Sequence, residues 1–218
     1  MLLRSASAEI AKRRREAPQV LIMELLARLA GKIGNNLVHS GVIKEEDAEI
    51  YIYGINQILT SVLNVSSALI IGLIFGVFPE IAVFMAAYIP LRSFAGGYHA
   101  KTPLSCYVFS VIMLIVISIG LKYLHLADWI YYAVLAVSIL VVLVLSPVQD
   151  RNKPLDEIEH KVFKRRSALI ATAELVICFS LWMMKLHSLF AAVVYSFAVL
   201  GFMLVAGKVK SFFGTKNM

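Results

Sequence analysis

The chain has 218 residues, of which 60 % are hydrophobic and 16 % charged, and its formal net charge is +7. The hydrophobic share exceeds the ~45–50 % typical of a soluble domain, and apolar runs of ~18 or more residues recur, so the composition predicts an all-α, polytopic integral membrane protein. The positive charge does not imply a nucleic-acid partner, because basic cytoplasmic loops explain it and point instead to membrane lipids or an acidic substrate segment.

The N-terminal region, residues 1–50, is predicted to lie in the cytoplasm and the membrane interface. Residues 1–17 are basic and lack the apolar stretch of a secretory signal peptide. A helix is predicted over residues 19–30, where Glu24 and Arg28 interrupt the apolar residues. It is too short and too charged to span, so we expect an interfacial amphipathic helix. Residues that favour turns are expected to end it: Gly31, Gly34, Asn35 and Asn36.

One membrane-embedded domain is predicted over residues 1–218, with a transmembrane core at 51–206 and a basic cytoplasmic tail at 207–218. The core holds about six hydrophobic segments, at residues 55–77, 79–91, 104–121, 129–147, 168–184 and 188–206. The second segment is short, ~20 Å as a helix against a hydrocarbon core of ~30 Å. We expect it to be re-entrant, to be buried among its neighbours, or to lie where the membrane is thinned.

The orientation in the membrane follows from the basic residues of the loops. With six passes, 19 of the 21 Lys and Arg residues fall on one side, and two, Lys122 and Lys185, fall on the other. The positive-inside rule therefore predicts that both termini, the basic loop at 150–166 and the loop at 92–106 lie in the cytoplasm.

The loop at residues 92–106 carries a histidine and a cysteine beside hydrophobic walls. His99 and Cys106 have the side chains most readily tuned to ionise near neutral pH, which indicates a nucleophile and its base. On one continuous helix the two residues would lie ~10.5 Å apart along the axis, whereas a nucleophile and its base need ~2.6–3.2 Å. The chain between them is therefore predicted not to be plain helix.

Glycine and proline in this loop support that prediction. The pair Gly96–Gly97 permits backbone angles that are closed to other residues. The pair Thr102–Pro103 is typical of a helix N-cap and first helical residue, so a helix is predicted to begin at Pro103. Cys106 then falls in the first turn, where the positive end of the helix dipole stabilises a thiolate, and the loop can fold His99 back over that turn.

Ordinary interpretations stand beside the catalytic one. A cysteine at the start of an apolar helix is often only a packed hydrophobe, and a loop histidine is often only solvated. Glu174 lies within a spanning run, where an acid is either functional or paired with a basic or amide side chain on a neighbouring helix. Cys178 is expected to serve packing. The sequence has no His-Glu-x-x-His zinc motif, phosphate-binding glycine loop or Gly-x-Ser-x-Gly elbow, and no cofactor is predicted.

A resemblance to a known family rests on five residues of this loop: Arg92, Gly97, His99, Ala100 and Cys106. At these spacings they resemble the signature of the accessory gene regulator B family. Members of that family are membrane cysteine endopeptidases that process a quorum-sensing pro-peptide in Gram-positive bacteria. The resemblance extends to the hydropathy of most of the chain and to the basic loop at 151–166, and it is weak over about the first forty residues.

The resemblance implies that Cys106 is the nucleophile and His99 the general base, and later the acid. Cys106 would release the C-terminal segment of the pro-peptide and form a thioester. A Cys or Ser of the peptide would then attack the thioester to close a thiolactone or lactone ring. The resemblance also implies a substrate with an amphipathic leader and an acidic tail, and it implies that the protein forms a homodimer.

Four further residues are expected to bind substrate or support the site. Arg92 matches a position of the family motif, Gly97 sets the backbone geometry, and Lys101 flanks the His–Cys pair. The fourth is Gln57, because the family has a functionally sensitive polar residue near this point of the first span. The sequence does not fix the register, so Asn56 stays open as the alternative.

A second class of function fits the same hydropathy, namely a non-enzymatic membrane transporter or peptide-export component. The number of spans and the intramembrane Glu174 favour it, whereas the absence of an inverted repeat and of paired broken helices disfavours it. A third class is a membrane scaffold. Replacement of Cys106 by Ala separates these classes, because it abolishes peptidase activity but leaves transport or scaffolding largely intact.

Overall fold

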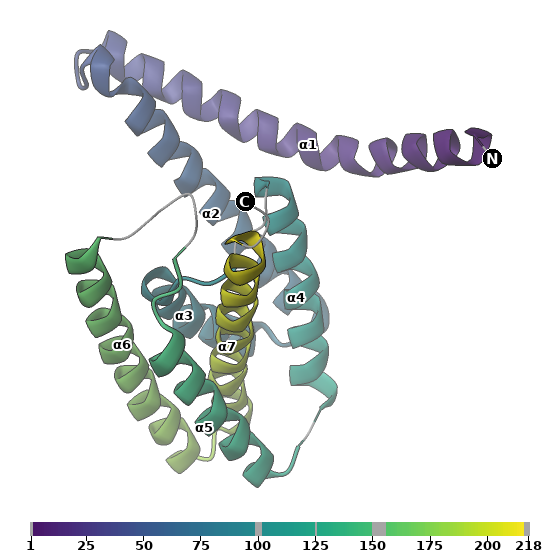
Figure 1. Cartoon of the computed structure of the whole chain (residues 1–218). Helices are drawn as coiled ribbons and strands as arrows, with labels where there is room; N and C mark the ends of the chain where they lie inside the picture. The colour runs from purple at the N-terminus through teal and green to yellow at the C-terminus, as the bar shows by residue number, and fades with distance from the viewer. Residues whose placement is uncertain (1, 99–101, 125, 150–155, 216–218) are drawn as a thin grey trace. The chain divides into compact units, whose positions relative to one another are not determined.

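The computed structural model describes residues 2–98, 102–124, 126–149 and 156–215, with side chains between residues 21 and 212 of these ranges. The described residues form seven α-helices: α1 (Leu2–His39), α2 (Ala48–Phe75), α3 (Phe78–Ala95), α4 (Pro103–Tyr123), α5 (Asp128–Leu145), α6 (Glu157–Met183) and α7 (His187–Thr215). A 3-10 turn, Glu45–Asp47, precedes α2, and an isolated bridge pairs Gly96 with Val148. The all-α prediction is confirmed (Figure 1).

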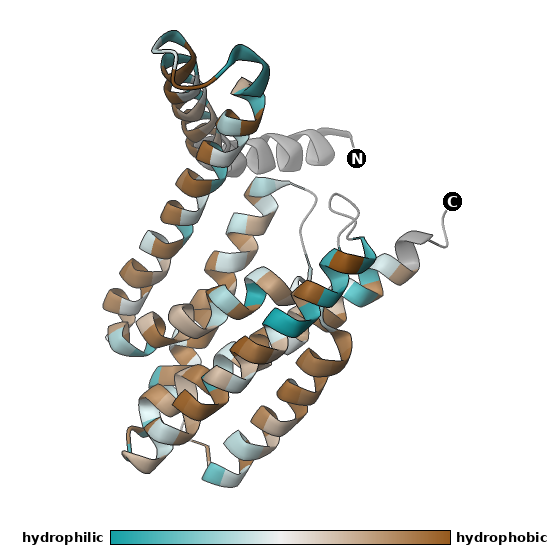
Figure 2. Cartoon of the chain, turned by 90° about the vertical axis from the view of Figure 1, so that its left-hand side faces the viewer, coloured by the Kyte–Doolittle hydropathy of each residue, from teal (hydrophilic) through white to brown (hydrophobic). Residues whose placement is uncertain are grey.

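Five helices in the described part of the chain are long and apolar enough to cross a membrane: Glu45–Phe75, Pro103–Tyr123, Asp128–Leu145, Glu157–Met183 and His187–Phe212. Large hydrophobic side chains are exposed along their lengths, for example Leu73, Val116, Leu140 and Val176. Figure 2 shows hydrophobic residues covering the sides of these helices, with hydrophilic residues gathered toward helix ends. Exposed apolar surface of this extent suits lipid, and the prediction of a multi-pass membrane protein is confirmed.

The short second segment forms α3, which is longer than expected. It runs for 18 residues, ~27 Å, and continues past residue 91 to Ala95. It ends at Gly96, whose φ of +73° stops the helix and whose N–H donates to the Arg92 carbonyl at 3.1 Å. Of the three expectations for this segment, burial among neighbours holds, because Ile81, Phe84 and Leu91 are at most 2 % exposed.

The predicted end of the N-terminal helix near residue 31 is wrong, because α1 is continuous through this stretch to His39. Gly34 does not break the helix but lets α1 approach α2 closely, since a Cβ at Gly34 would overlap the Ile52 side chain. The helix ends instead at His39, and Gly41 in the following turn has a φ of +70° and donates its N–H to the Val38 carbonyl at 2.9 Å. Exposed apolar side chains follow α1 at four-residue spacing: Leu21, Leu25, Leu29 and Ile33.

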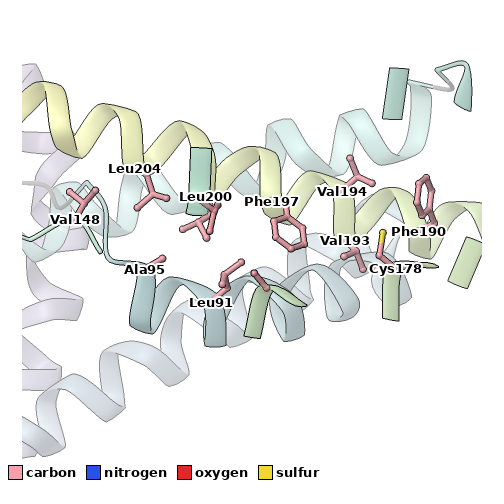
Figure 3. Close-up of a cluster of buried hydrophobic side chains, with 12 residues drawn as sticks. Leu91, Ala95, Val148, Cys178, Phe190, Val193, Val194, Phe197, Leu200 and Leu204 are labelled. Atoms are coloured by element: carbon pink, nitrogen blue, oxygen red, sulfur yellow. The ribbon is translucent and has the colours of Figure 1, made fainter. Parts of the chain in front are cut away.

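The chain divides into two compact units, residues 1–67 with 101–111 and residues 68–100 with 112–218. In the larger unit α7 is the central helix and packs against α3, α5 and α6. In its most apolar stretch 61 % of the residues are buried, against 11–22 % in the other spanning helices. Figure 3 shows Leu200 and Leu204 of α7 facing Leu91 and Ala95 of α3. The end of α3, and with it the start of the 92–106 loop, therefore rests on α7.

Candidate active site

Cys106 lies in the first turn of α4, as predicted from the Thr102–Pro103 pair. The Thr102 Oγ1 accepts a hydrogen bond from the Ser105 N–H at 3.1 Å and lies 2.8 Å from the Ser105 Oγ, so Thr102 is the N-cap. Pro103 is the first helical residue, and the Cys106 N–H donates to the Thr102 carbonyl at 3.1 Å. The Cys106 thiol is free and its residue is half-buried. Local sequence alone is enough to fix where this cysteine stands on its helix.

The hydrogen bonds around Cys106 are mostly local to α4. The Ser110 Oγ donates to the Cys106 carbonyl at 3.0 Å, one turn further along. A tertiary hydrogen bond follows at the next residue, where the Tyr107 hydroxyl lies 2.9 Å from the Ser67 Oγ of α2. In the smaller unit, therefore, the turn that carries the thiol is bonded within α4 and is joined to α2 by a neutral hydroxyl pair.

Arg92 lies at the other end of the motif, in the last turn of α3. Its guanidinium donates from Nη1 to the Gly96 carbonyl and from Nη2 to the Tyr98 carbonyl, the latter at 2.5 Å. The planar fork of an arginine suits two such acceptors because it presents parallel donors in a fixed geometry. The half-buried Arg92 thus closes the backbone of residues 96–98 onto the end of α3.

Gly96 and Gly97 adopt the left-handed backbone angles that the sequence predicted, with φ of +73° and +126°. Neither position has room for a side chain. A Cβ at Gly96 would overlap the Val148 carbonyl oxygen, and a Cβ at Gly97 would overlap the Arg92 Nη1 and lie 3.2 Å from the Met203 carbonyl oxygen. The two glycines are required both by conformation and by the close approach of three other segments.

Other segments of the chain also contact residues 92–98, and these contacts were not predicted from the sequence. The Val148 N–H donates to the Ala95 carbonyl at 2.9 Å, and the Tyr98 N–H donates to the Met203 carbonyl of α7 at 2.9 Å. The Lys210 Nζ lies 5.1 Å from the centre of the Tyr98 ring. Another such contact joins the end of α3 to α6, where the Arg166 guanidinium lies 5.4 Å from the Phe94 ring centre. A sequence signal that could have marked these contacts is Gly207, a glycine near the end of an apolar helix, where a Cβ would lie 2.9 Å from the Tyr98 nitrogen.

The remaining predicted site residues fall into two groups. His99 and Lys101 lie outside the described residues, so their predicted roles stay predictions. Gln57 lies on α2 with an exposed side chain, and its backbone carbonyl accepts from the Ser61 Oγ at 2.8 Å. The neighbouring Asn56 is half-buried. The structure therefore brings Arg92 and Gly97 into contact in the larger unit, whereas Gln57 and Cys106 belong to the smaller unit.

Glu174 and Cys178 lie one turn apart on α6 and are buried, at 6 % and 1 % exposure. Cys178 packs in the cluster around α7, consistent with a packing role (Figure 3). The Glu174 Oε2 has no hydrogen-bond partner among the described residues. The same residues hold no group of three or more His, Cys, Asp or Glu side chains that is arranged to bind a metal ion.

Comparisons with known proteins match most of the chain. The model of the family described as accessory gene regulator B matches residues 27–205. The chain is 27 % identical to an AgrB-like protein of Clostridium perfringens strain 13 over 165 residues, which cover 72 % of this chain and 75 % of the relative. It is 28 % identical to the protein FsrB of Enterococcus faecalis over 173 residues, 75 % of this chain and 70 % of the relative.

A third relative is an AgrB-like protein of Listeria monocytogenes serotype 4a, 26 % identical over 131 residues, which cover 59 % of this chain and 64 % of the relative. No solved structure matches. The family match begins within α1 at residue 27, ends within α7 at residue 205, and includes the whole 92–106 loop. The chain therefore belongs to the accessory gene regulator B family, a family of membrane proteins involved in quorum-sensing peptide processing.

Proposed function

We propose that this protein is a membrane cysteine endopeptidase that removes the C-terminal segment of a quorum-sensing pro-peptide and so prepares the peptide for cyclisation. The observation that carries the proposal is the position of Cys106, a free and half-buried thiol in the first turn of an N-capped helix. The positive end of the helix dipole favours negative charge at such a position. Membership of the family supports a role in peptide processing in general.

The proposed reaction begins with proton transfer from the Cys106 thiol to the His99 imidazole. The thiolate sulfur then bonds to the carbonyl carbon of the scissile peptide bond. The bond from that carbon to nitrogen breaks as the His99 imidazolium returns the proton to the leaving amine. The C-terminal segment departs, and the rest of the peptide stays on Cys106 as a thioester.

Ring closure then uses the energy kept in the thioester. A thiol or hydroxyl within the peptide attacks the thioester carbonyl, giving a thiolactone or lactone, and its proton passes to the departing Cys106 thiolate. Exchange of one thioester for another is close to balanced, whereas making a thiolactone directly from an amide is uphill. Water must be excluded during this step, which suits a site beside membrane helices.

The supporting residues have two kinds of role in this proposal. Arg92 and Gly97 act on the backbone that leads into His99, because the Arg92 guanidinium bonds to the Gly96 and Tyr98 carbonyls. Lys101 and the polar face of α2 at Gln57 are available to bind substrate. The same proposal covers the substrate, the assembly and the orientation. The substrate has an amphipathic leader, and its acidic tail is held by the basic loop at 151–166. The protein forms a homodimer, with the catalytic loop and both termini in the cytoplasm.

One observation favours a second candidate, a membrane transporter or peptide-export component. Glu174 is buried in a spanning helix, and its Oε2 has no hydrogen-bond partner among the described residues. Acidic groups inside membrane helices commonly serve ion or substrate pathways. This candidate predicts that Cys106 is dispensable.

The test uses purified protein in lipid vesicles and a synthetic pro-peptide, taken from a small open reading frame beside the gene, with a central Cys and an acidic tail. Intact mass spectrometry follows a hydroxylamine-sensitive adduct. We expect an adduct on the wild type and none on Cys106→Ala. On His99→Ala the adduct should form much more slowly than on the wild type. Cys178→Ala is the matched control and should keep the adduct, because Cys178 is 1 % exposed in the core. Cleavage by folded Cys106→Ala would refute the proposal and favour the transporter.

A further inference from the structure

The last turns of α7 lie directly against residues 97–98, immediately before His99. The Tyr98 N–H donates to the Met203 carbonyl oxygen at 2.9 Å. In an α-helix that oxygen also accepts from the N–H four residues further on, which here is Gly207. A carbonyl oxygen has two lone pairs, but a side chain at the fourth residue would crowd the second one. The hydrogen bond from Tyr98 is accessible because residue 207 has no side chain.

Gly207 also leaves no room for a methyl group. A Cβ there would lie 2.9 Å from the Gly97 carbonyl carbon, 2.9 Å from the Tyr98 nitrogen and 3.1 Å from the Val148 Cγ1. The first two neighbours are backbone atoms of the loop, so no rotation of a flexible side chain can relieve the overlap. The backbone of α7 does accept alanine, since Gly207 is helical and alanine forms helices better than glycine does.

Other groups hold the start of the same loop, where it leaves α3. The Val148 N–H bonds to the Ala95 carbonyl, and the Arg92 guanidinium bonds to the Gly96 and Tyr98 carbonyls. A methyl group on Gly207 therefore pushes most strongly on Gly97 and Tyr98, the part of the loop nearest His99. Gly207 itself is buried, and α7 contains the most buried apolar stretch of the spanning helices.

We propose that Gly207 is a positioning residue for the reaction, because its missing side chain sets the depth at which residues 97–98 dock on α7 and thereby the position of the backbone from which His99 follows. This inference rests on the proposed function, in which His99 is the base. Gly207 touches neither substrate nor the reacting atoms in this proposal and acts through the backbone of Gly97 and Tyr98.

The test compares Gly207→Ala with a matched variant of the same helix, Gly201→Ala. A Cβ at Gly201 has only ordinary contacts, 3.6 Å to the Val141 Cγ1 and 3.8 Å to Ser138. Each full-length variant in lipid vesicles is mixed with the synthetic pro-peptide described above, and the rate of adduct formation is measured against peptide concentration. A displacement of ~1 Å at a reacting group costs ~100-fold, so Gly207→Ala should lower the maximal rate by about 10- to 100-fold.

The concentration at half-maximal rate and the thermal midpoint separate positioning from a structural role. We expect the half-saturating concentration of Gly207→Ala to stay within about twofold of the wild type, because the reacting geometry is altered and the binding of the peptide is not. Its thermal midpoint should fall by only a few degrees, since the higher helix propensity of alanine partly offsets the cost of displacing the loop. Gly201→Ala should match the wild type in all three quantities. A folded Gly207→Ala that is as fast as Gly201→Ala would overturn the inference and leave the proposed function standing, provided that Cys106→Ala is inactive.

Two further outcomes are decisive. If Cys106→Ala still cleaves the peptide, the proposed function and this inference both fail. If Gly207→Ala does not fold, Lys210→Met takes its place, because the exposed Lys210 lies over the Tyr98 ring and its loss loosens the same docking contact. We then expect a maximal rate lowered about two- to fivefold relative to Lys208→Met, and equal rates would overturn the inference.

Discussion

The two halves of the 92–106 loop are built in different ways. Residues 92–98 are held by two residues from distant parts of the chain, Val148 and Met203 of α7, and by the side chain of Arg92 within this half. Residues 102–106 are held mainly by their own helix, through the Thr102 cap and the first-turn hydrogen bonds of α4. Both halves are short and adjoin apolar helices, yet one is anchored by tertiary contacts and the other by local sequence.

This difference decides how mutations should act on the proposed reaction. A histidine that follows a tertiary anchor is displaced by changes far away in sequence, whereas a cysteine in a capped helical turn is sensitive mainly to its immediate neighbours. We therefore expect large effects on rate from residues that dock the 92–98 half, and modest effects on stability from residues that cap the 102–106 half.

Among the residues that support the loop, the largest effect is expected for Arg92→Lys. Lysine keeps the charge but has a single nitrogen in place of the planar fork, so it can keep at most one of the two bonds to the Gly96 and Tyr98 carbonyls. The rate of peptide cleavage should fall about 100-fold, because the base is then displaced by about 1 Å or more. Arg28→Lys is the control: Arg28 forms an exposed ion pair with Glu24, and such pairs contribute little. Full activity of Arg92→Lys would mean that the guanidinium does not hold the loop.

A comparable effect on rate, with a measurable loss of stability, is expected for Gly97→Ala. Alanine at a φ of +126° is strained by about 1–3 kcal/mol, and its Cβ would overlap the Arg92 Nη1. Gly76→Ala separates strain from crowding, because Gly76 also has a positive φ, +72°, but nothing lies within 4 Å of its Cβ. Thermal midpoint and cleavage rate should both fall for Gly97→Ala, and only the midpoint for Gly76→Ala. Equal rates for the two variants would remove crowding as a cause.

The same contrast explains what the sequence did and did not predict. The helix start at Pro103 and the left-handed pair Gly96–Gly97 were predicted correctly, because caps and glycines act on their own backbone. The partners of the 92–98 half were not, since Val148 and Met203 lie about 50 and 100 residues away and no local pattern marks them. Gly34 was misinterpreted for a related reason: its role is to admit Ile52 of α2, and a close helix contact resembles a helix break in sequence.

A moderate effect, mainly on stability, is expected for Thr102→Ala. Loss of the hydrogen bond from the Ser105 N–H to the Thr102 Oγ1 should lower the free energy of unfolding by about 1 kcal/mol, as for other N-caps. The cleavage rate should fall by no more than about fivefold, because the rest of α4 still fixes the turn that carries Cys106. Thr102→Ser keeps the cap and should restore both quantities. Loss of activity in Thr102→Ser would point to a role of the threonine methyl group instead.

The smallest effect is expected for the hydrogen bond between Tyr107 and Ser67, which ties α4 to α2 at 2.9 Å. A cycle of Tyr107→Phe, Ser67→Ala and the double variant should give a coupling energy of about 0.6 kcal/mol, the average for neutral side-chain hydrogen bonds between membrane helices. The cleavage rate should stay within about threefold of the wild type in all three variants, since a loss of about 0.6 kcal/mol changes a rate by no more than that. A loss of tenfold or more in Tyr107→Phe, with the fold intact, would show that the cysteine half also depends on a tertiary anchor. The contrast between the two halves would then not hold, because the first turn of α4 would depend on a contact with α2 in the way that residues 96–98 depend on contacts with α7.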